Sequence, residues 1–356
     1  MIDVSSFVEM IQALQVDFFT GVPDSLLKSF CAYVEDNCRT RHVIAANEGG
    51  AIGLASGYYL ATGKPALVYM QNSGQGNAVN PLCSLVDPDV YSIPMVLLVG
   101  WRGEPGVKDE PQHVKQGKVT IPLFKTLDIP TEILPDDESF AAEVIRKMVG
   151  RAKTESRPVA LVIRKGLFTE YRLKNKNPDI AELPREQAIE DVLKALPDDA
   201  VVVSTTGMIS REVYEARERL GQNHSRDFLT VGSMGHALMI ALGVARAQPN
   251  RRVYCLDGDG SSIMQMGNMA IAGQSGCANL THVVFNNAAH DSVGGQPTVG
   301  GAINLPAIAE ACGYNCDGAP VFMEIKVAKG ARKDLGRPKE HPQMSKELYM
   351  KTLGVL

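Results

Sequence analysis

The sequence predicts an α/β protein made of two doubly wound parallel-sheet domains. Its 356 residues suffice for about two domains, each with its own core. Short apolar runs alternate with segments of helical apolar spacing, which is the pattern of successive βαβ units. A polar segment that contains Pro178 and Pro184 and has no apolar period interrupts this alternation. We therefore expect a first domain over residues 1–170, a linker over 171–184 and a second domain over 185–356.

The composition excludes several classes of protein. With 45% hydrophobic and 21% charged residues, the chain is an ordinary globular one. A formal net charge of −4 argues against nucleic acid or an acidic membrane surface as the main partner. The N-terminal segment carries Asp3, Glu9 and Asp17 and is no signal peptide, and no apolar run approaches the ~18 residues of a membrane-spanning helix. The seven cysteines are scattered, and Cys312 and Cys316 lack the second ligand pair of a zinc site. We expect reduced thiols and a cytoplasmic protein.

The first domain is expected to begin with a helix and a strand. Apolar spacing predicts a helix over 3–14 and a strand over 16–20, and a helix over 26–34 follows the loop Gly21-Val22-Pro23-Asp24-Ser25. Asp24 or Ser25 is expected to cap that helix. Because the loop follows a strand at the carboxyl edge of the sheet, contact of Asp24 and Ser25 with a substrate is the alternative.

Glu48 follows the next predicted strand, over residues 42–46, and precedes a helix rich in Gly and Ala. Glycines inside a helix cost stability, so another helix is expected to pack closely on it. As a carboxylate at a helix N-terminus, Glu48 is stabilised by the helix dipole. The remaining elements of this domain are expected as a helix over 138–151 and strands over 65–70, 94–101, 129–134 and 159–164.

Two loops of the first domain are candidates for substrate contact. Residues 71–77, which include Gln71 and Gln75, are small or carry amides, and they form either an ordinary turn or an anion-tolerant loop. Residues 102–118 are charged, rich in Pro and Gly, and without apolar period. A long loop of this kind is either solvated or a functional lid. His113 is its one residue that titrates near neutrality.

The second domain is expected to open with a helix over 185–196 and a strand over 200–203. That strand runs into a polar loop that contains Thr206 and Gly207, before a helix over 210–219. A strand over 228–231 leads to the glycine-rich segment 232–237, in which Met234 is by default a core residue. His236 and His290 are expected near a functional site, whereas His282 lies inside a predicted strand and is expected in the core.

The stretch 253–298 carries the most specific signal. A strand over 253–256 ends on Asp257-Gly258-Asp259-Gly260, a helix over 261–273 follows, and a strand over 280–285 ends on Asn286-Asn287. Parallel strands of a βαβ unit end at one edge of the sheet, so Asp259 and Asn287 are expected to face one point. Carboxylate and amide oxygens suit Mg²⁺ together with phosphate oxygens, and the helix start at Ser261 suits a phosphate. Two unrelated turns are the alternative.

The C-terminal region departs from a regular βαβ pattern. A helix over 304–311 is followed by a strand over 321–327, with too few residues between them for a further helical crossover. Either a segment has been lost or residues are absent. Residues 330–338 are basic and punctuated by glycine, and they form either a solvated terminus or a segment that closes over an anion.

The motif Gly258-Asp259-Gly260 followed by Asn286-Asn287 resembles the metal–diphosphate motif of thiamine diphosphate enzymes. The resemblance implies that Asp259, Asn287 and the backbone carbonyl of Ala289 hold Mg²⁺. It also implies that Glu48 hydrogen-bonds the aminopyrimidine of thiamine diphosphate and that Met234 props the bent cofactor. The expected cofactor-binding residues are Glu48, Thr206, Gly207, Ser233, Met234, Gly258, Asp259, Gly260, Ser261 and Asn287.

This resemblance covers nearly the whole chain and implies a pyrimidine-binding domain and a diphosphate-binding domain, without the middle domain of larger relatives. The segments GVPDS, QNSGQGN and AHDSVGGQPT are most similar to members of the family that decarboxylate the 2-oxo acid phosphonopyruvate, and next to those that act on sulfopyruvate. The family implies a homodimer or larger assembly with sites between subunits. Glu48 and His113 are the expected catalytic residues, and the expected substrate contacts are Asp24, Ser25, Gln71, Gln75 and His113.

Two other classes of protein stay open. A Mg²⁺-dependent phosphoryl-transfer enzyme would use Asp257 or Asp259, although the chain has no Gly-x-x-x-x-Gly-Lys-[Ser/Thr] loop. A non-catalytic binding subunit would keep the cofactor pocket without needing Glu48. The cation that recognises the second anion of the substrate is undecided, and the candidates are Arg102, Lys108, His113, Lys115, Arg332 and Arg337.

Overall fold

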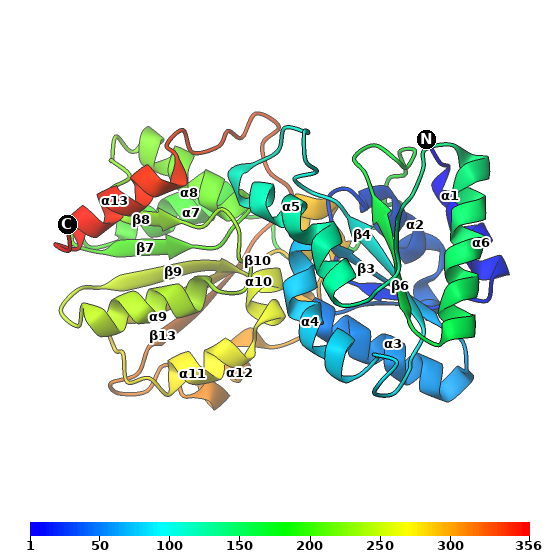
Figure 1. The fold of residues 1–356 in the computed structure, drawn as a ribbon. Coiled ribbons are helices and arrows are strands. Elements are labelled where there is room, and N and C mark those ends of the chain that lie inside the picture. Colours follow the sequence, from blue (N-terminus) through cyan, green and yellow to red (C-terminus); the bar gives the residue numbers. More distant parts are fainter. The chain divides into compact units, whose positions relative to one another are not determined.

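The computed structural model describes residues 1–356, which form two compact units, Met1–Lys176 and Asn177–Leu356 (Figure 1). The division falls inside the range 171–184. The first part of that range packs on the first unit, because Leu173 is buried and the N–H groups of Lys174 and Asn175 donate to the carboxylate of Asp36. No helix combines the length and the apolar character needed to cross a bilayer.

The first unit contains a six-stranded parallel sheet in the order β2-β1-β3-β4-β6-β5. Its strands are β1 (Phe19–Gly21), β2 (His42–Ile44), β3 (Ala66–Gln71), β4 (Met95–Gly100), β5 (Thr131–Ile133) and β6 (Pro158–Ile163). Its helices are α1 (Val4–Ala13), α2 (Lys28–Asn37), α3 (Glu48–Thr62), α4 (Gln75–Ser84), α5 (Pro111–Thr126) and α6 (Glu138–Glu155).

Helices cover both faces of this sheet, and the central strands are therefore apolar on both sides. Every residue of β4 and β6 is buried, as in parallel sheets with two covered faces. One apolar cluster joins β3, β4 and β6 to α1, α2 and α6, and a second joins them to α3, α4 and α5. The layers place the carboxyl ends of all six strands at one edge.

The second unit contains a five-stranded parallel sheet in the order β13-β10-β9-β7-β8, and a two-stranded ribbon. The sheet strands are β7 (Val201–Ser204), β8 (Asp227–Leu229), β9 (Val253–Gly258), β10 (Leu280–Asn286) and β13 (Val321–Lys326), and the ribbon is β11 (Ala289–His290) with β12 (Gln296–Pro297). The helices are α7 (Arg185–Ala195), α8 (Met208–Arg219), α9 (Ala237–Ala247), α10 (Asp259–Met264), α11 (Gly267–Gly273), α12 (Leu305–Cys312) and α13 (Pro342–Thr352).

The predicted fold class is confirmed. Helices α7 and α8 pack on one face of the second sheet, and α9, α11 and α12 pack on the other (Figure 1). Each unit is thus a parallel sheet between two helical layers, and no middle domain separates them. The helix over 304–311 is itself the crossover between β10 and β13, which pair directly. The gap at 313–320 is a loop that holds no further strand or helix, in agreement with the expectation that it is too short for another crossover.

Several predicted boundaries were also wrong. Residues 75–77 and 111–118 lie in α4 and α5 rather than in loops, because Gln75 and Pro111 each begin a helix. The helix predicted over 26–34 starts at Lys28, and its N-cap, Leu27, makes no side-chain cap. Edge strand β2 is not a buried strand, since Val43 is 45% exposed.

The single helix predicted over 261–273 is two short helices, α10 and α11. Gln265 leaves the helical region between them, with φ −131° and ψ 49°. Its side chain lies against Gly235, where a Cβ would come within 2.6 Å of the Gln265 Cγ. Packing against the glycine-rich segment therefore breaks a helix that the sequence spacing makes continuous.

Candidate active site

Asp259 and Asn287 lie together at the carboxyl edge of the second sheet, where β9 and β10 end. The two strands are parallel neighbours, with Phe285 beside Gly258. The backbone N–H of Asn287 donates to the Asp259 carboxylate, which joins the two strand ends directly. The Asp259 and Asn287 side chains are 2% and 4% exposed. The convergence inferred from the βαβ pattern is therefore present in the fold.

Asp259 is a buried carboxylate without an ion pair. Burial raises its pKa to about 6, and hydrogen bonds from the Thr298 hydroxyl and from backbone N–H groups only partly oppose this rise. Gly300 lies against it, since a Cβ there would be 2.6 Å from Asp259 Oδ2. A desolvated carboxylate of this kind is stabilised by a bound cation.

Asn287 is oriented by a chain of buried charges. Its Nδ2 donates to Asp291 Oδ2 at 2.6 Å, and its Oδ1 accepts from Ala289 N at 3.0 Å. Asp291 in turn accepts from Arg185 Nη1 at 3.0 Å. Arg185, 5% exposed, is held by both carboxylate oxygens of Glu212 at 2.7 and 3.0 Å. The amide nitrogen is thus fixed on Asp291, and the amide oxygen faces the other way.

The loops at the ends of β7 and β8 meet α10. Ser261 Oγ accepts from Thr205 Oγ1 at 2.9 Å and from Gly235 N at 3.1 Å, so this predicted cofactor residue ties three segments together. Gly207 has φ +94°, a conformation that L side chains rarely adopt, and forms the N-cap of α8. Ser233 also has a positive φ, +55°. Because β7 lies between β8 and β9, these loops flank the switch point of the sheet, where open α/β sheets bind ligands.

Met234 and His290 lie against the Asp259 turn. A Cβ at Gly260 would be 3.5 Å from Met234 Cε and 3.2 Å from the His290 ring. Met234 is half-buried, so the default expectation of a core residue was wrong. Burial lowers the pKa of His290 to about 4. His236 is exposed, whereas His282 is a fully buried core histidine 3.4 Å from Asp257, as expected.

Glu48 occupies the carboxyl edge of the first sheet, directly after β2, at the start of α3. Its side chain is 4% exposed and its Oε2 accepts from Asn77 Nδ2 at 2.7 Å. Burial raises the pKa of Glu48, and no cation pairs with it among residues 1–356. A Cβ at Gly74 would come within 2.1 Å of Glu48 Oε1, so only glycine fits there.

Asp24 and Ser25 lie at the same edge, after β1. Asp24 is fully buried; its Oδ2 accepts from Leu26 N at 3.0 Å, whereas its Oδ1 has no partner. Burial raises the pKa of Asp24 to about 6. Ser25 Oγ accepts from Arg102 Nη1 at 2.9 Å. Arg102 is itself clamped by both carboxylate oxygens of Asp109 at 2.8 and 2.6 Å.

The segment 102–118 is not the continuous loop that was expected, because residues 111–118 lie in α5 and the Arg102–Asp109 pair fastens the rest. His113 lies in the first turn of α5, and burial lowers its pKa to about 4, with Arg102 adding to the effect. Gln71 is half-buried, and its amide donates to Ser73. Gln75 is 1% exposed and bonds Thr120 and Gln116, so its amide is engaged inside the unit.

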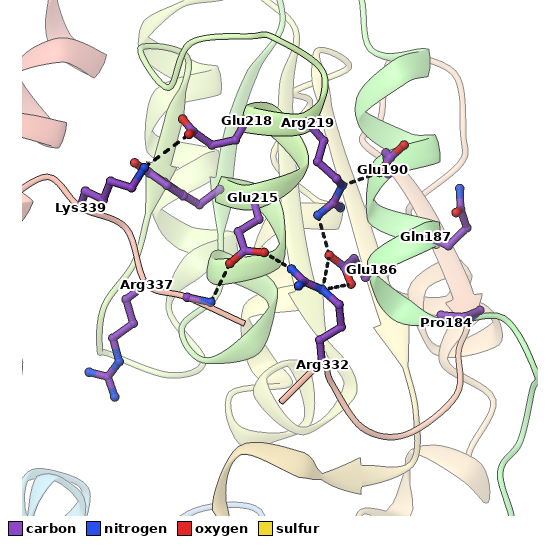
Figure 2. Close-up of a pocket in the computed structure, with 12 residues that line it drawn as sticks. Pro184, Glu186, Gln187, Glu190, Glu215, Glu218, Arg219, Arg332, Arg337 and Lys339 are labelled. Atoms are coloured by element: carbon purple, nitrogen blue, oxygen red, sulfur yellow. Dashed lines mark hydrogen bonds and ion pairs between the residues drawn. The ribbon is translucent and has the colours of Figure 1, made fainter. Parts of the chain in front are cut away.

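Most residues of the basic tail are exposed, as expected of a solvated terminus, and ion pairs of Arg332 fasten the tail to α7 and α8. Arg332 bonds Glu186, Glu215 and Asp334, and Gly336 N donates to Glu215 at 2.6 Å. A hollow of about 790 Å³ between this tail, α7 and α8 is lined by such paired charges, and Figure 2 shows Arg219 and Arg332 both directed at Glu186. None of the predicted active-site residues lines it apart from the two anion candidates, Arg332 and Arg337.

Comparison with known proteins identifies the family. Residues 4–121 match the "Thiamine pyrophosphate enzyme, N-terminal TPP binding domain" and residues 205–342 the "Thiamine pyrophosphate enzyme, C-terminal TPP binding domain". The chain belongs to the thiamine pyrophosphate enzyme family. Each family domain lies within one of the two units, and each carries one of the two clusters of buried carboxylates described above.

Three relatives match over most of their length. A phosphonopyruvate decarboxylase of Streptomyces hygroscopicus is 35% identical over 380 residues, covering 96% of this chain and 92% of that one. A phosphonopyruvate decarboxylase of Streptomyces viridochromogenes is 34% identical, with the same coverage. A sulfopyruvate decarboxylase of Methanosarcina acetivorans is 27% identical and covers 86% of this chain and 81% of that one.

The residues at the second sheet edge fit the groups that thiamine pyrophosphate enzymes bind. Asp259, Asn287 Oδ1 and the Ala289 carbonyl are hard oxygen donors of the kind that Mg²⁺ takes. Thr298 N donates to Ala288 O at 3.0 Å, so Ala289 and Pro297 form a non-hydrogen-bonded pair and the Ala289 carbonyl points out of the ribbon. Gln296, fully buried beside His290, has both amide atoms unpaired. Buried acceptors and amides without partners are what a bound metal and diphosphate satisfy.

Sequence reasoning missed several of the residues that support this site. Thr298, Asp291 and Gln296 belong to the stretch singled out for its similarity, but nothing local shows which atom each one contacts. Arg185 and Glu212 carried no signal, because they reach the site from α7 and α8. Asn77 was included only as one of several amides in the loop after β3.

We predict that replacing Asp24 with Asn stabilises the first unit at neutral pH. The folded-state pKa of about 6 lies above the ordinary value of 3.8, so ionised Asp24 opposes folding. This cost is absent below about pH 4, grows between pH 4 and 6 and is constant above, and Asn removes it. Urea unfolding should show a gain on the order of 2 kcal/mol at pH 7.5 that vanishes near pH 4. An equal gain at both pH values would contradict the assignment.

We predict that Asp291→Ala weakens divalent-metal binding without unfolding the second unit. Loss of the carboxylate frees the Asn287 amide to rotate, and removal of such an orienting partner costs about 10–100-fold in metal affinity. Titration of Mn²⁺ in the presence of thiamine diphosphate, followed by electron paramagnetic resonance, measures this directly. Asp334→Ala, which removes an exposed carboxylate of the tail, is the matched control and should leave the affinity unchanged. Equal affinities in both variants would rule out the orienting role.

Proposed function

We propose that this protein decarboxylates 3-phosphonopyruvate to phosphonoacetaldehyde and CO₂ with thiamine diphosphate and Mg²⁺. The observation that carries the proposal is similarity to two phosphonopyruvate decarboxylases over 96% of this chain and 92% of theirs. The buried Glu48 and the Asp259–Asn287 turn support it, because a buried carboxyl group and a set of hard oxygen donors suit the cofactor and its metal. The product assigns the enzyme to phosphonate biosynthesis.

The part proposed for Glu48 is to hold and move a proton. Bound thiamine diphosphate supplies a nucleophilic carbon and an electron sink for the bond to the departing carboxylate. Asn77 fixes Glu48 Oε2, which leaves Oε1 to exchange a proton with the aminopyrimidine. Burial raises the pKa of Glu48, so its carboxyl group is able to carry that proton in a pocket without water.

The second unit is proposed to bind and orient. Asp259, Asn287 and the Ala289 carbonyl would hold Mg²⁺, and the diphosphate would be bound by the segments at Thr206, Gly207, Ser233, Gly258, Gly260 and Ser261. Met234, half-buried beside Gly260, offers an apolar support for the bent cofactor. These contacts fix the reacting carbon without taking part in bond cleavage.

Asp24, Ser25, Gln71 and His113 are proposed to face the substrate. Asp24, with its pKa raised to about 6, is able to exchange a proton near neutrality. His113, with its pKa lowered to about 4, is a neutral imidazole there and offers the substrate a hydrogen-bond donor and an acceptor. Gln75 is left out because its amide is engaged. Of the cations considered for the phosphonate, Arg102 and Arg332 are held by carboxylates. Exposed Lys108 and Lys115 are the better candidates.

We further propose a homodimer or larger assembly in which α3 meets a second subunit. Gly53 and Gly57 of α3 are exposed, and a Cβ at either would meet nothing within 4 Å. Leu54 and Leu60 on the same helix are 37% and 75% exposed. Glycines that weaken a helix without serving a contact inside the chain fit a close approach by a partner, as the family implies for its shared sites.

Sulfopyruvate is the second candidate substrate. A sulfopyruvate decarboxylase subunit beta of Methanothermobacter thermautotrophicus is 39% identical over 37% of this chain, a higher local identity than the 35% and 34% of the two phosphonopyruvate decarboxylases. Because phosphonate and sulfonate are both tetrahedral anions, the fold and the cofactor would be common to the two reactions. The preference between them therefore has to be measured.

We predict that Glu48→Gln lowers turnover by about 10²–10⁴-fold, because a general acid–base of this kind contributes that much. Cofactor affinity, measured by fluorescence quenching, should change far less, since Gln keeps the hydrogen bond to Asn77. Glu9→Gln, an exposed carboxylate of α1, is the control. Unchanged turnover in Glu48→Gln would remove the thiamine mechanism.

We predict CO₂ release from phosphonopyruvate that depends on both thiamine diphosphate and Mg²⁺. Phosphonopyruvate, sulfopyruvate and pyruvate should each be assayed with and without the two cofactors. A preference for sulfopyruvate would agree with the proposed cofactor chemistry but would contradict the proposed substrate. No release from any of the three would reject decarboxylation of these acids altogether.

A further inference from the structure

The two sheets have the same strand order, with one strand missing from the second. In chain order, β7, β8, β9, β10 and β13 occupy the positions that β1, β2, β3, β4 and β6 occupy in the first sheet. Between β4 and β6 the first unit has α5, β5 and α6. Between β10 and β13 the second unit has a single α-helix, α12. Counterparts of β5 and α6 are absent. The match to the Streptomyces hygroscopicus relative spans 380 positions, more than the 356 residues here, so that relative contains residues that this chain lacks.

In the first unit, β5 and α6 cover the last strand completely. Strand β5 pairs with β6 along its outer edge, with Glu132 beside Leu161. Helix α6 packs on β6 and β4, and Ile145, Met148 and Val149 belong to the same apolar cluster as β6. As a result all six residues of β6 are buried.

Strand β13 has neither cover. Phe322 faces α12 and is 6% exposed, but Val321 and Met323, on the opposite face, are 42% and 45% exposed. In the register of the sheet, Val321 lies beside Thr281, and Thr281 lies beside Tyr254. Thr281 and Tyr254 are only half-buried. Apolar side chains are therefore exposed on the face of the second sheet that corresponds to the face covered by α6 in the first unit.

The outer edge of β13 is free over a short, well-defined length. Val327 N donates to Asn286 O on β10 at 2.9 Å, so odd-numbered residues bond inward and even-numbered residues point outward. At one end Phe322 N is capped by Asn315 Oδ1 at 2.9 Å. At the other, Ala328 N donates to Leu183 O at 2.8 Å. Between them, the outward backbone groups of Glu324 and Lys326 have no partner among residues 1–356.

We propose that β13 pairs antiparallel with β13 of a second copy of this chain, about a two-fold axis at Ile325. This register places Glu324 opposite Lys326 of the second copy, and Lys326 opposite Glu324, so opposite charges meet at both hydrogen-bonded pairs. A shift of one residue in the axis, to Glu324, would set two glutamates opposite each other. A shift to Met323 would require Asn315 to leave Phe322.

Charge complementarity thus selects a second copy as the occupant, because the exposed Lys326 finds its counter-charge in Glu324 of the second copy. Asn286 Nδ2 donates to Glu324 Oε1 at 2.7 Å, which leaves Oε2 of that carboxylate for the lysine. Pairing also supplies the missing hydrogen bonds of the edge and brings Met323 and Ile325 beside apolar residues of the second strand. The contact uses none of the proposed active-site residues and is distinct from the α3 surface. If both contacts form, the protein is a dimer of dimers, and the inference does not depend on the proposed reaction.

Charge reversal tests the pairing through the mass of the assembly. Sedimentation of the full chain at low salt should give Lys326→Glu half the mass of the unaltered protein, because four glutamates then meet at the axis. Glu324→Lys should do the same. An equimolar mixture of the two variants should recover the original mass, since each supplies the charge that the other needs. Lys346→Glu, on α13 at the opposite edge of the sheet, is the control. Unchanged mass in Lys326→Glu, or no recovery in the mixture, would overturn the proposal.

A disulfide tests the register independently of charge. In a non-hydrogen-bonded antiparallel pair the Cα atoms are about 4.5 Å apart, within the range for a disulfide. Exposed Cys83 and Cys316 are first replaced with Ser. Ile325→Cys should then form a covalent dimer under mild oxidation, whereas Met323→Cys, which faces Val327 of the second copy, should not. Thermal melting of both variants shows that they are folded. Cross-linking at Met323 and not at Ile325 would contradict the two-fold axis.

Discussion

Burial of carboxylates at the ends of parallel strands is the constraint on which the rest of this structure depends. Removing a carboxylate from water is costly unless hydrogen bonds or a cation compensate. Asp259 receives the Thr298 hydroxyl and the Asn287 N–H, and Glu48 receives the Asn77 amide. Burial nevertheless raises the pKa of each. Both sites hold unsatisfied polar capacity that a bound cofactor and its metal are suited to meet.

Glycines beside these carboxylates follow from the same constraint. A Cβ at Gly74 would lie 2.1 Å from Glu48 Oε1, and one at Gly300 would lie 2.6 Å from Asp259 Oδ2. The neighbouring backbone therefore packs directly on the carboxylates and keeps water away from them. In the second unit the Arg185–Glu212 pair adds a rigid support behind Asp291. The hydrogen bonds around the carboxylates therefore offset only part of the cost of burying them.

The two units share one sheet topology but differ in whether the last strand is covered by a further strand and helix. Strand β6 is buried throughout because β5 and α6 enclose it, whereas β13 alternates between buried and exposed residues. The site lies at the carboxyl ends of β7, β9 and β10, and β10 is the direct neighbour of β13. Strand β13 supports the end of β10, because Val327 N donates to Asn286 O and Glu324 accepts from Asn286 Nδ2.

The fold class and the central pair of the site were accessible from the sequence alone. Apolar runs that alternate with segments of helical spacing predict parallel sheets with both faces covered. The strand ends that carry Asp259 and Asn287 must then meet at the carboxyl edge of the second sheet, and Glu48 must lie at the carboxyl edge of the first. These inferences depend on local pattern and on chain connectivity, which the sequence contains.

Only the tertiary structure decided which distant groups hold those residues in place. Arg185 bonds Asp291 across 106 positions, Arg102 is taken up by Asp109, and Gln75 is turned inward by α5. The start of α5 at Pro111 and the helix break at Gln265 could not be predicted from the sequence for the same reason. The partner of a side chain, and the end of a helix that packs on other segments, are set by contacts between elements rather than by neighbours in the chain.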